Sequence, residues 1–210
     1  LSVPVYLCLG NHDLTCVDAL ELWLREAPQF FGANGVNFSV ETDDCLLHVA
    51  PNQWGSEPYF WHGVQQPHFL NEQERFVEAA LARAPEKTHI LSTHSPVCGV
   101  PCEQTGYDEP YHSSPPAFAE RVGAWALASP HLACVLGAHS HINSRVEVGG
   151  VHYVTSSSFA EVPFDFKLFA IGEGRATMTT VSLVERVDFS VQYAFDKTFV
   201  QGREKDRRLP

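Results

Sequence analysis

Residues 3–13 read VPVYLCLGNHD, an apolar run that stops at a cluster of polar side chains. The run at residues 3–9 has the length and the unbroken hydrophobicity of a strand buried on both faces, which is typical of a parallel sheet. The cluster that follows is Gly10-Asn11-His12-Asp13. Ligands of open α/β sheets bind just beyond the carboxyl ends of the strands. This stretch therefore predicts an α/β fold and the place of its functional site.

Two later segments repeat this arrangement of an apolar strand followed by histidine. The expected strand at residues 88–92 leads to His94, and the one at 132–136 leads to His139 and His141. If these strands are neighbours in one sheet, the three histidines converge with Asn11 and His12. Imidazole and amide groups together suit divalent zinc, iron or manganese. The alternative is structural: a polar turn at Asn11 and His12, and hydrogen-bonded histidines at the strand ends.

The rest of the chain alternates helices and strands over its first two-thirds and is expected to be all strands afterwards. Residues 51–69 and the segment from 93 to 116 are long loops, which often carry binding residues on a packed scaffold. We expect one domain over residues 1–200 and a charged, solvated tail at 201–210. Helices are expected at 17–26, 71–83 and 117–127, and further strands at 37–41, 45–50, 145–148, 151–155, 167–171, 176–184 and 188–193, with turns at 149–150 and 172–174.

Composition narrows the possible partners. Hydrophobic residues make up 44% of the 210 residues and charged residues 19%, as expected for a globular protein with a core. A net charge of -11 argues against general affinity for nucleic acid, whereas bound cations would still allow a small phosphorylated substrate. No apolar run reaches the roughly 20 residues that span a bilayer. The oligomeric state and the compartment stay open, with the cytoplasm weakly favoured.

The six cysteines predict no structural zinc site. None of them forms a Cys-x-x-Cys pair, which such sites usually contain. Cys8, Cys45 and Cys134 lie in apolar runs and are expected to be buried. Cys98 and Cys102 flank a Gly-Val-Pro turn and would form a disulfide only in an oxidising compartment.

Taken together, the polar clusters resemble those of calcineurin-like metallophosphoesterases. That family's pattern is Asp-x-His, Gly-Asp-x-x-Asp, Gly-Asn-His-Asp/Glu, a lone His after a strand, and Gly-His-x-His. Gly10-Asn11-His12-Asp13 matches the third block in full, His94 matches the fourth, and Ala138-His139-Ser140-His141 matches the fifth with alanine in place of glycine. The resemblance implies a four-layer α/β/β/α sandwich that is missing its first strands.

The resemblance also implies a role for each matching residue. Asn11, His94 and His139 would bind the second of two metal ions, and His141 would bind the first. His12 would be catalytic, beside the phosphate, and Asp13 would order the loop or orient His12. Two divalent ions (manganese, iron or zinc), roughly 3.5–4 Å apart, would hold the phosphate while a metal-activated hydroxide attacks phosphorus. The expected reaction is hydrolysis of small phosphomonoesters or phosphodiesters.

The sequence departs from the family pattern at its amino end. Residues 1–9 contain no aspartate or histidine, so the first two blocks, with a bridging aspartate and two more ligands of the first metal, are absent. We therefore expect this chain alone to be impaired. Two other functions are alternatives to a metal-dependent esterase. One is a non-catalytic remnant that binds a metal or a partner, and the other is a metal-free histidine hydrolase. Minor candidates for substrate contact or loop packing are His62, His112, Trp54, Phe60, Trp61, Tyr107 and Tyr111.

Overall fold

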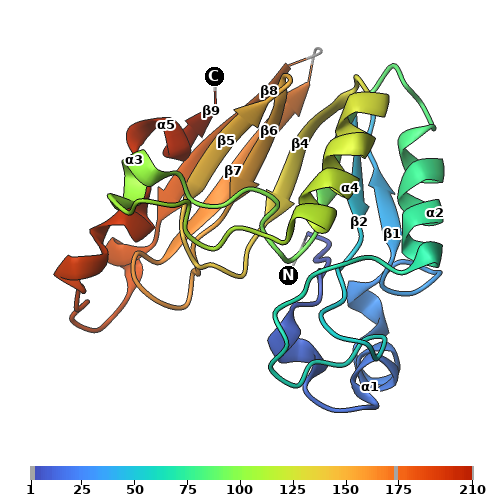
Figure 1. Ribbon diagram of the computed structural model, residues 1–210, viewed down its shortest axis with the longest axis horizontal. Coiled ribbons are helices and arrows are strands. Elements are labelled where there is room, and N and C mark those ends of the chain that lie inside the picture. The colour runs from blue at the N-terminus through green and yellow to red at the C-terminus, as the bar shows by residue number, and fades with distance from the viewer. Residues whose placement is uncertain (1–2, 173–174, 210) are drawn as a thin grey trace.

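The structure is a computed structural model that describes residues 3–172 and 175–209. Its main sheet is mixed and has six strands in the order β1-β2-β3-β4-β6-β5 (Figure 1). Strands β2, β3, β4 and β6 run parallel, and β1 and β5 are antiparallel strands at the edges. The six strands are β1 (Phe38–Glu41), β2 (Cys45–Val49), β3 (Thr88–Ser92), β4 (Leu132–Gly137), β5 (Ser144–Val148) and β6 (Val151–Thr155).

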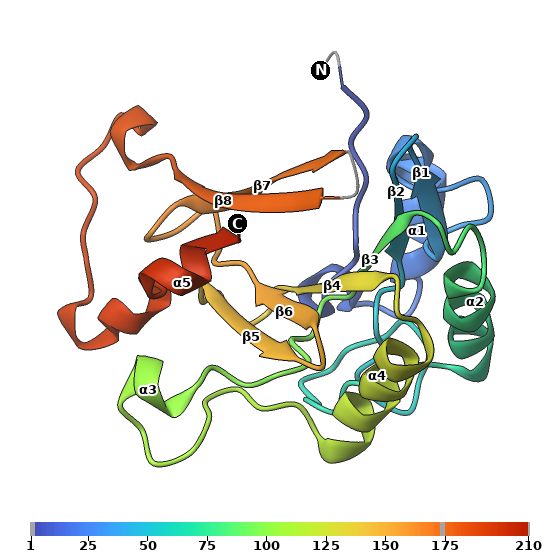
Figure 2. The ribbon, with the colours of Figure 1, turned by 90° about the horizontal axis from the view of Figure 1, so that it is seen from above.

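One face of the main sheet is covered by helices and the other by a second sheet (Figure 2). Helices α2 (Asn71–Leu81) and α4 (Pro116–Ala128) pack on the first face, where Val77 and Trp125 join Leu91 of β3 in one apolar cluster. On the second face, Met178 packs with Ile90 and Cys134. The central strands are thus apolar on both faces because both faces are covered. The remaining helices are α1 (Ala19–Glu26), α3 (Cys102–Thr105) and α5 (Glu204–Arg207), with 3-10 turns at Asn11–Leu14, Pro28–Phe30, Val184–Arg186 and Phe195–Gln201.

The second sheet has three strands in the order β7 (Asp165–Gly172), β8 (Arg175–Ser182) and β9 (Arg208–Leu209). Its outward side chains are exposed: Phe166 is 38% and Leu168 56% accessible. Helices, main sheet and second sheet make three layers in the part of the chain that is described. The mixed α/β class is confirmed, whereas the fourth layer of the predicted sandwich stays a prediction. The predicted turn at 172–174 includes residues 173 and 174, which lie outside the described residues.

The predicted strand at residues 3–9 is wrong. This segment pairs with neither sheet, although Leu9 is only 1% exposed and packs in the core. Strand β3 lies between β2 and β4, and β4 between β3 and β6, so neither of these central strands has a free edge for it. The Leu7 N–H donates instead to the Phe30 carbonyl at 3.0 Å. The hydrophobicity of this segment correctly predicted that Leu9 is buried, but it did not predict whether the segment pairs with a strand.

The last third of the chain differs from the prediction in two ways. Residues 188–193 are not a strand: they pair with neither sheet and are mostly exposed, with Phe189 57% and Tyr193 40% accessible. The carboxyl end is not a solvated tail either: Asp206 is fully buried, and Arg203 Nε donates to its Oδ2 at 2.7 Å. The charged side chains of this segment pair with one another and with Glu103 and Asp165. The other predicted helices and strands are present, with ends that shift by a few residues.

Two smaller expectations concern the cysteines and the membrane. All six cysteines are free thiols, so Cys98 and Cys102 are not bridged in this structure. Cys45 and Cys134 are buried as predicted, and burial raises the pKa of the Cys134 thiol to about 12.

Within residues 3–172 and 175–209, none of the helices has both the length and the hydrophobicity needed to cross a bilayer.

Candidate metal centre

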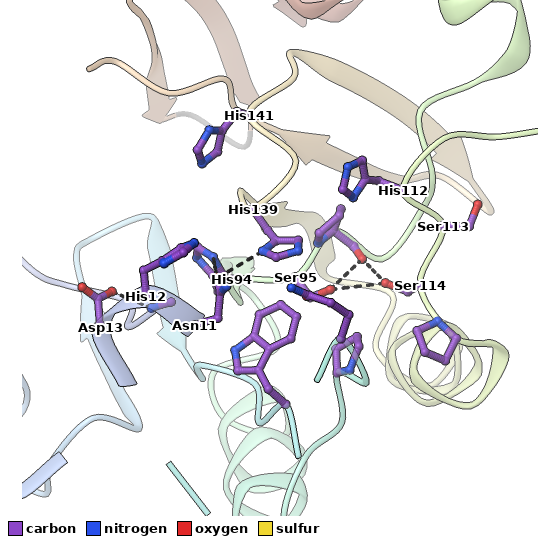
Figure 3. Close-up of a pocket in the computed structure, with 16 residues that line it drawn as sticks. Asn11, His12, Asp13, His94, Ser95, His112, Ser113, Ser114, His139 and His141 are labelled. Atoms are coloured by element: carbon purple, nitrogen blue, oxygen red, sulfur yellow. Dashed lines mark hydrogen bonds between the residues drawn. The ribbon is translucent and has the colours of Figure 1, made fainter. Parts of the chain in front are cut away.

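Three of the predicted ligands meet at the carboxyl ends of β3 and β4. Asn11 begins the 3-10 turn Asn11–Leu14, His94 follows β3, and His139 follows β4. His94 Nε2 and His139 Nδ1 each lie 3.2 Å from the same atom, Asn11 Oδ1. These side chains line a cavity of about 560 Å³ (Figure 3). The structure thus brings together three residues that are up to 128 positions apart in the sequence.

The polar turn at residues 10–13 is fixed by Asp13 and by close packing at Gly10. The Gly10 N–H donates to Asp13 Oδ2 at 2.8 Å, so Asp13 orders the turn. A Cβ atom at residue 10 would lie 2.5 Å from a carbon of the His94 ring. Glycine is therefore needed here because the histidine occupies the space of a side chain. The two motifs around residues 10 and 94 form one packed unit.

The His94 loop is held by Asn52, a residue that the sequence did not single out. Asn52 is fully buried, and its Oδ1 accepts hydrogen bonds from the Ser95 N–H at 2.7 Å and from Thr93 Oγ1 at 3.2 Å. Both donors flank His94, so Asn52 fixes the backbone that presents the imidazole. Nothing in its sequence context distinguishes it from the other polar residues of the long loop at 51–69.

Trp54 packs under the two imidazoles. Its ring centre is 4.7 Å from that of His139 and 5.9 Å from that of His94, and it is only 1% exposed. Burial lowers the pKa of His94 to about 3 and that of His139 to about 4, with smaller contributions from neighbouring histidines. Both rings are therefore neutral near pH 7, the form of imidazole that binds metal ions.

His141 lies apart from the other predicted ligands, although it lines the same cavity (Figure 3). Both His139 and His141 have a left-handed backbone, with φ of 55° and 56°. Such backbone is costly for residues other than glycine and concentrates at functional sites. It also breaks the alternation of an extended strand, so the two side chains do not share one face. His141 Nδ1 contacts Glu161 Oε1, an acidic partner that no sequence motif marks.

Two further histidines border the cavity. His12 is exposed and its ring centre is 4.8 Å from that of Trp61, which limits its orientations without burying it. His112 also lines the cavity, with its ring centre 6.0 Å from that of His139. His62 is exposed and is not part of the lining. Of the two loop histidines considered for substrate contact, the structure thus places only His112 at the cavity.

The donors fit one divalent ion. Ligands about 2.0–2.2 Å from an ion lie roughly 3 Å from one another, close to the separations observed around Asn11 Oδ1. Among residues 3–172 and 175–209, no three His, Cys, Asp or Glu side chains are grouped to hold a metal ion. The donor set at this site is not such a group, because it combines two histidines with the side-chain amide of Asn11. The ligand assignments, including that of His141 to another ion, stay predictions.

Comparison with known proteins supports the resemblance on which these assignments depend. A search among curated proteins found no match. The family model described as calcineurin-like phosphoesterase matches residues 1–143, which include Asn11, His12, His94, His139 and His141. Members of this family hydrolyse phosphoesters and typically bind divalent metals. The matched region is more than half of the chain, which therefore belongs to the calcineurin-like phosphoesterase family.

Proposed function

We propose that this chain hydrolyses phosphomonoesters or phosphodiesters of small molecules with the help of two divalent metal ions. The observation that carries the proposal is the convergence of His94 Nε2 and His139 Nδ1 on Asn11 Oδ1, each at 3.2 Å. Neutral imidazoles beside an amide oxygen form a donor set for a borderline divalent ion. A cavity of about 560 Å³ lies in the range that small-molecule sites occupy.

Each residue has a distinct task in this proposal. Asn11, His94 and His139 would hold one ion, and His141 would hold the other. When bound, such ions polarise the phosphate oxygens and make water a strong nucleophile at neutral pH. His12 is exposed at the rim, where it would hydrogen-bond the phosphate and give a proton to the leaving oxygen. Asp13 keeps the turn in place through the Gly10 N–H.

The test combines metal content with turnover. Metal-free chain is titrated with Mn²⁺, and hydrolysis of p-nitrophenyl phosphate and bis-p-nitrophenyl phosphate is followed. We expect bound manganese and esterase activity to appear together and to be lost on chelation, and the activity to be weak, because the ion assigned to His141 has no other proposed ligand. Activity that survives complete chelation would reject the metal mechanism in favour of a metal-free histidine hydrolase. His62→Ala, at an exposed histidine outside the cavity, is the matched control and should keep both properties.

A second candidate is a module that binds metal or a partner without turnover. It is favoured by the position of His141, which stands apart from the three converging donors and contacts Glu161 instead. The same titration separates the two functions. Tight binding of one Mn²⁺ per chain with no hydrolysis of either ester supports the module. Metal-dependent hydrolysis supports the enzyme.

A further inference from the structure

A second cavity adjoins the candidate metal centre. It has a volume of about 470 Å³ and shares His141 with the first cavity. Tyr111 lines this second cavity, and its ring centre lies 4.4 Å from that of His112, which lines the first. The two cavities are therefore neighbours, with a shared boundary formed by His141 and by the Tyr111–His112 pair. A ligand that extends past His141 from the first cavity would enter the second.

The wall of the second cavity is aromatic. Tyr107, Tyr111 and Phe199 line it, with ring centres 5.6–6.0 Å apart in pairwise edge arrangements. Tyr107 remains 48% and Tyr111 38% exposed, so these rings are not simply core packing. Tyr193, also part of the lining, is 40% exposed. Exposed aromatic faces in a cavity favour flat aromatic ligands, because such ring pairs gain more than buried area alone provides.

Hydrogen bonds hold this wall in place before any ligand arrives. Gln104, in α3, donates through Nε2 to the Asn143 carbonyl and to the Phe199 carbonyl, each at 2.8 Å. Val100 and Tyr111 exchange backbone hydrogen bonds of 2.7 and 3.0 Å. The aromatic residues therefore come from segments that are tied to one another and, through Asn143, to the loop that carries His141. A preformed wall costs a ligand less ordering entropy.

From this arrangement we propose that the second cavity is a subsite for the leaving group, and that it selects phosphoesters whose leaving group carries a flat aromatic ring. This inference rests on the proposed function, because the phosphate would occupy the first cavity. The ring would pack against Tyr107, Tyr111 and Phe199. Glu161 and Lys197 line the same cavity and offer an acceptor and a donor to polar atoms on that ring.

The test measures binding, so it does not depend on turnover. Benzylphosphonate and cyclohexylmethylphosphonate carry the same phosphonate and equal numbers of carbon atoms, but only the first has a flat aromatic ring. Calorimetric titration of the Mn²⁺-loaded chain should show roughly two- to tenfold tighter binding of benzylphosphonate. Tyr107→Leu should bring this ratio to about one while leaving cyclohexylmethylphosphonate binding in place. Phe195→Leu should keep the preference, because Phe195 is 85% exposed and does not line the cavity.

Each other outcome decides against the subsite. Equal binding of the two phosphonates by the unaltered chain rejects the subsite alone and leaves the phosphate site standing. A preference that survives both Tyr107→Leu and Phe199→Leu also rejects it. If Mn²⁺ binds but neither phosphonate does, the proposed phosphate site fails and the subsite fails with it. Thermal unfolding of each variant shows that the fold is retained.

Discussion

Two pairs of histidines, one inside the main sheet and one just past its strand ends, differ in what their ring nitrogens contact. His48 in β2 and His89 in β3 are fully buried and form a closed chain of hydrogen bonds. His48 Nδ1 lies 2.7 Å from Ser39 Oγ, His48 Nε2 lies 2.9 Å from His89 Nδ1, and His89 Nε2 lies 3.1 Å from the Ala84 carbonyl. His94 and His139, just past the strand ends, instead converge on one amide oxygen and border a cavity.

The difference shows that clustering of histidines does not by itself leave ring nitrogens directed at a cavity. Burial lowers the pKa of His48 to about 4, much as it does for His139. Both pairs are therefore neutral near pH 7. Both ring nitrogens of His48 and of His89 contact protein partners inside the sheet, whereas His94 and His139 each direct one nitrogen at Asn11 Oδ1 beside a cavity. Position relative to the strand end decides which pair can take a ligand.

We call His94 and His139 the open pair, and His48 and His89 the closed pair. The largest expected effect comes from removing the atom that both members of the open pair contact. Asn11→Ala removes the oxygen on which His94 and His139 converge. Loss of a neighbour that merely orients a ligand costs 10–100-fold, so loss of a ligand should lower kcat/KM by about a hundredfold or more, about 3 kcal/mol. Manganese affinity should fall in parallel. Steady-state kinetics and metal titration measure the two effects.

This prediction has a clear contrary result. If Asn11→Ala binds manganese as tightly as the unaltered chain, Asn11 is not a ligand. The proposal that it binds one ion together with His94 and His139 then fails. The unfolding free energy should change little, because the freed imidazole nitrogens face the cavity and can bond water there. His62→Ala again provides the comparison for a histidine that lies outside the cavity.

The contrast also shows what the sequence could predict. The order of strand ends and polar clusters predicted that five side chains converge, and three of them, Asn11, His94 and His139, do meet, whereas His141 lies apart. Backbone direction after the strand was not predictable, because the left-handed conformation of His139 and His141 depends on how the turn packs. The partners supplied by loops, such as Asn52 and Glu161, have no periodic or motif signal at all.

The same reasoning explains the errors in the fold. Hydrophobicity shows that a segment is buried but not whether a strand edge is free beside it. Residues 3–9 and 188–193 both read as strands, yet neither segment pairs with a strand, and residues 188–193 are mostly exposed. The charged carboxyl end was expected in solvent because single charges prefer water. Its buried Asp206 is stable there because Arg203 pairs with it.

The second-largest expected effect comes from removing the hydrogen bonds that His48 makes in the closed pair. His48→Leu keeps a side chain of similar volume but leaves Ser39 Oγ and His89 Nδ1 without their partner. Unsatisfied buried groups of this kind should lower the unfolding free energy by about 2 kcal/mol. Denaturant unfolding measures the loss. Manganese affinity should be unchanged, and a substantial fall in it would show that the two pairs are coupled rather than independent.

The smallest expected effect is the pH dependence of the closed pair. Burial, and secondarily the neighbouring His89, holds the pKa of His48 at about 4 in the folded chain. The unfolded chain, with a pKa near 6.5, binds more protons between these values, so folding stability falls as the pH falls below about 6.5. His48 alone should cost about 1 kcal/mol between pH 6.5 and 5.5. Because His48→Leu removes this titration, its unfolding free energy should decline less over that interval than that of the unaltered chain. If the unfolding free energies of His48→Leu and of the unaltered chain decline equally between the two pH values, His48 is not held neutral by the fold. The closed and open pairs would then differ in more than their hydrogen-bond partners.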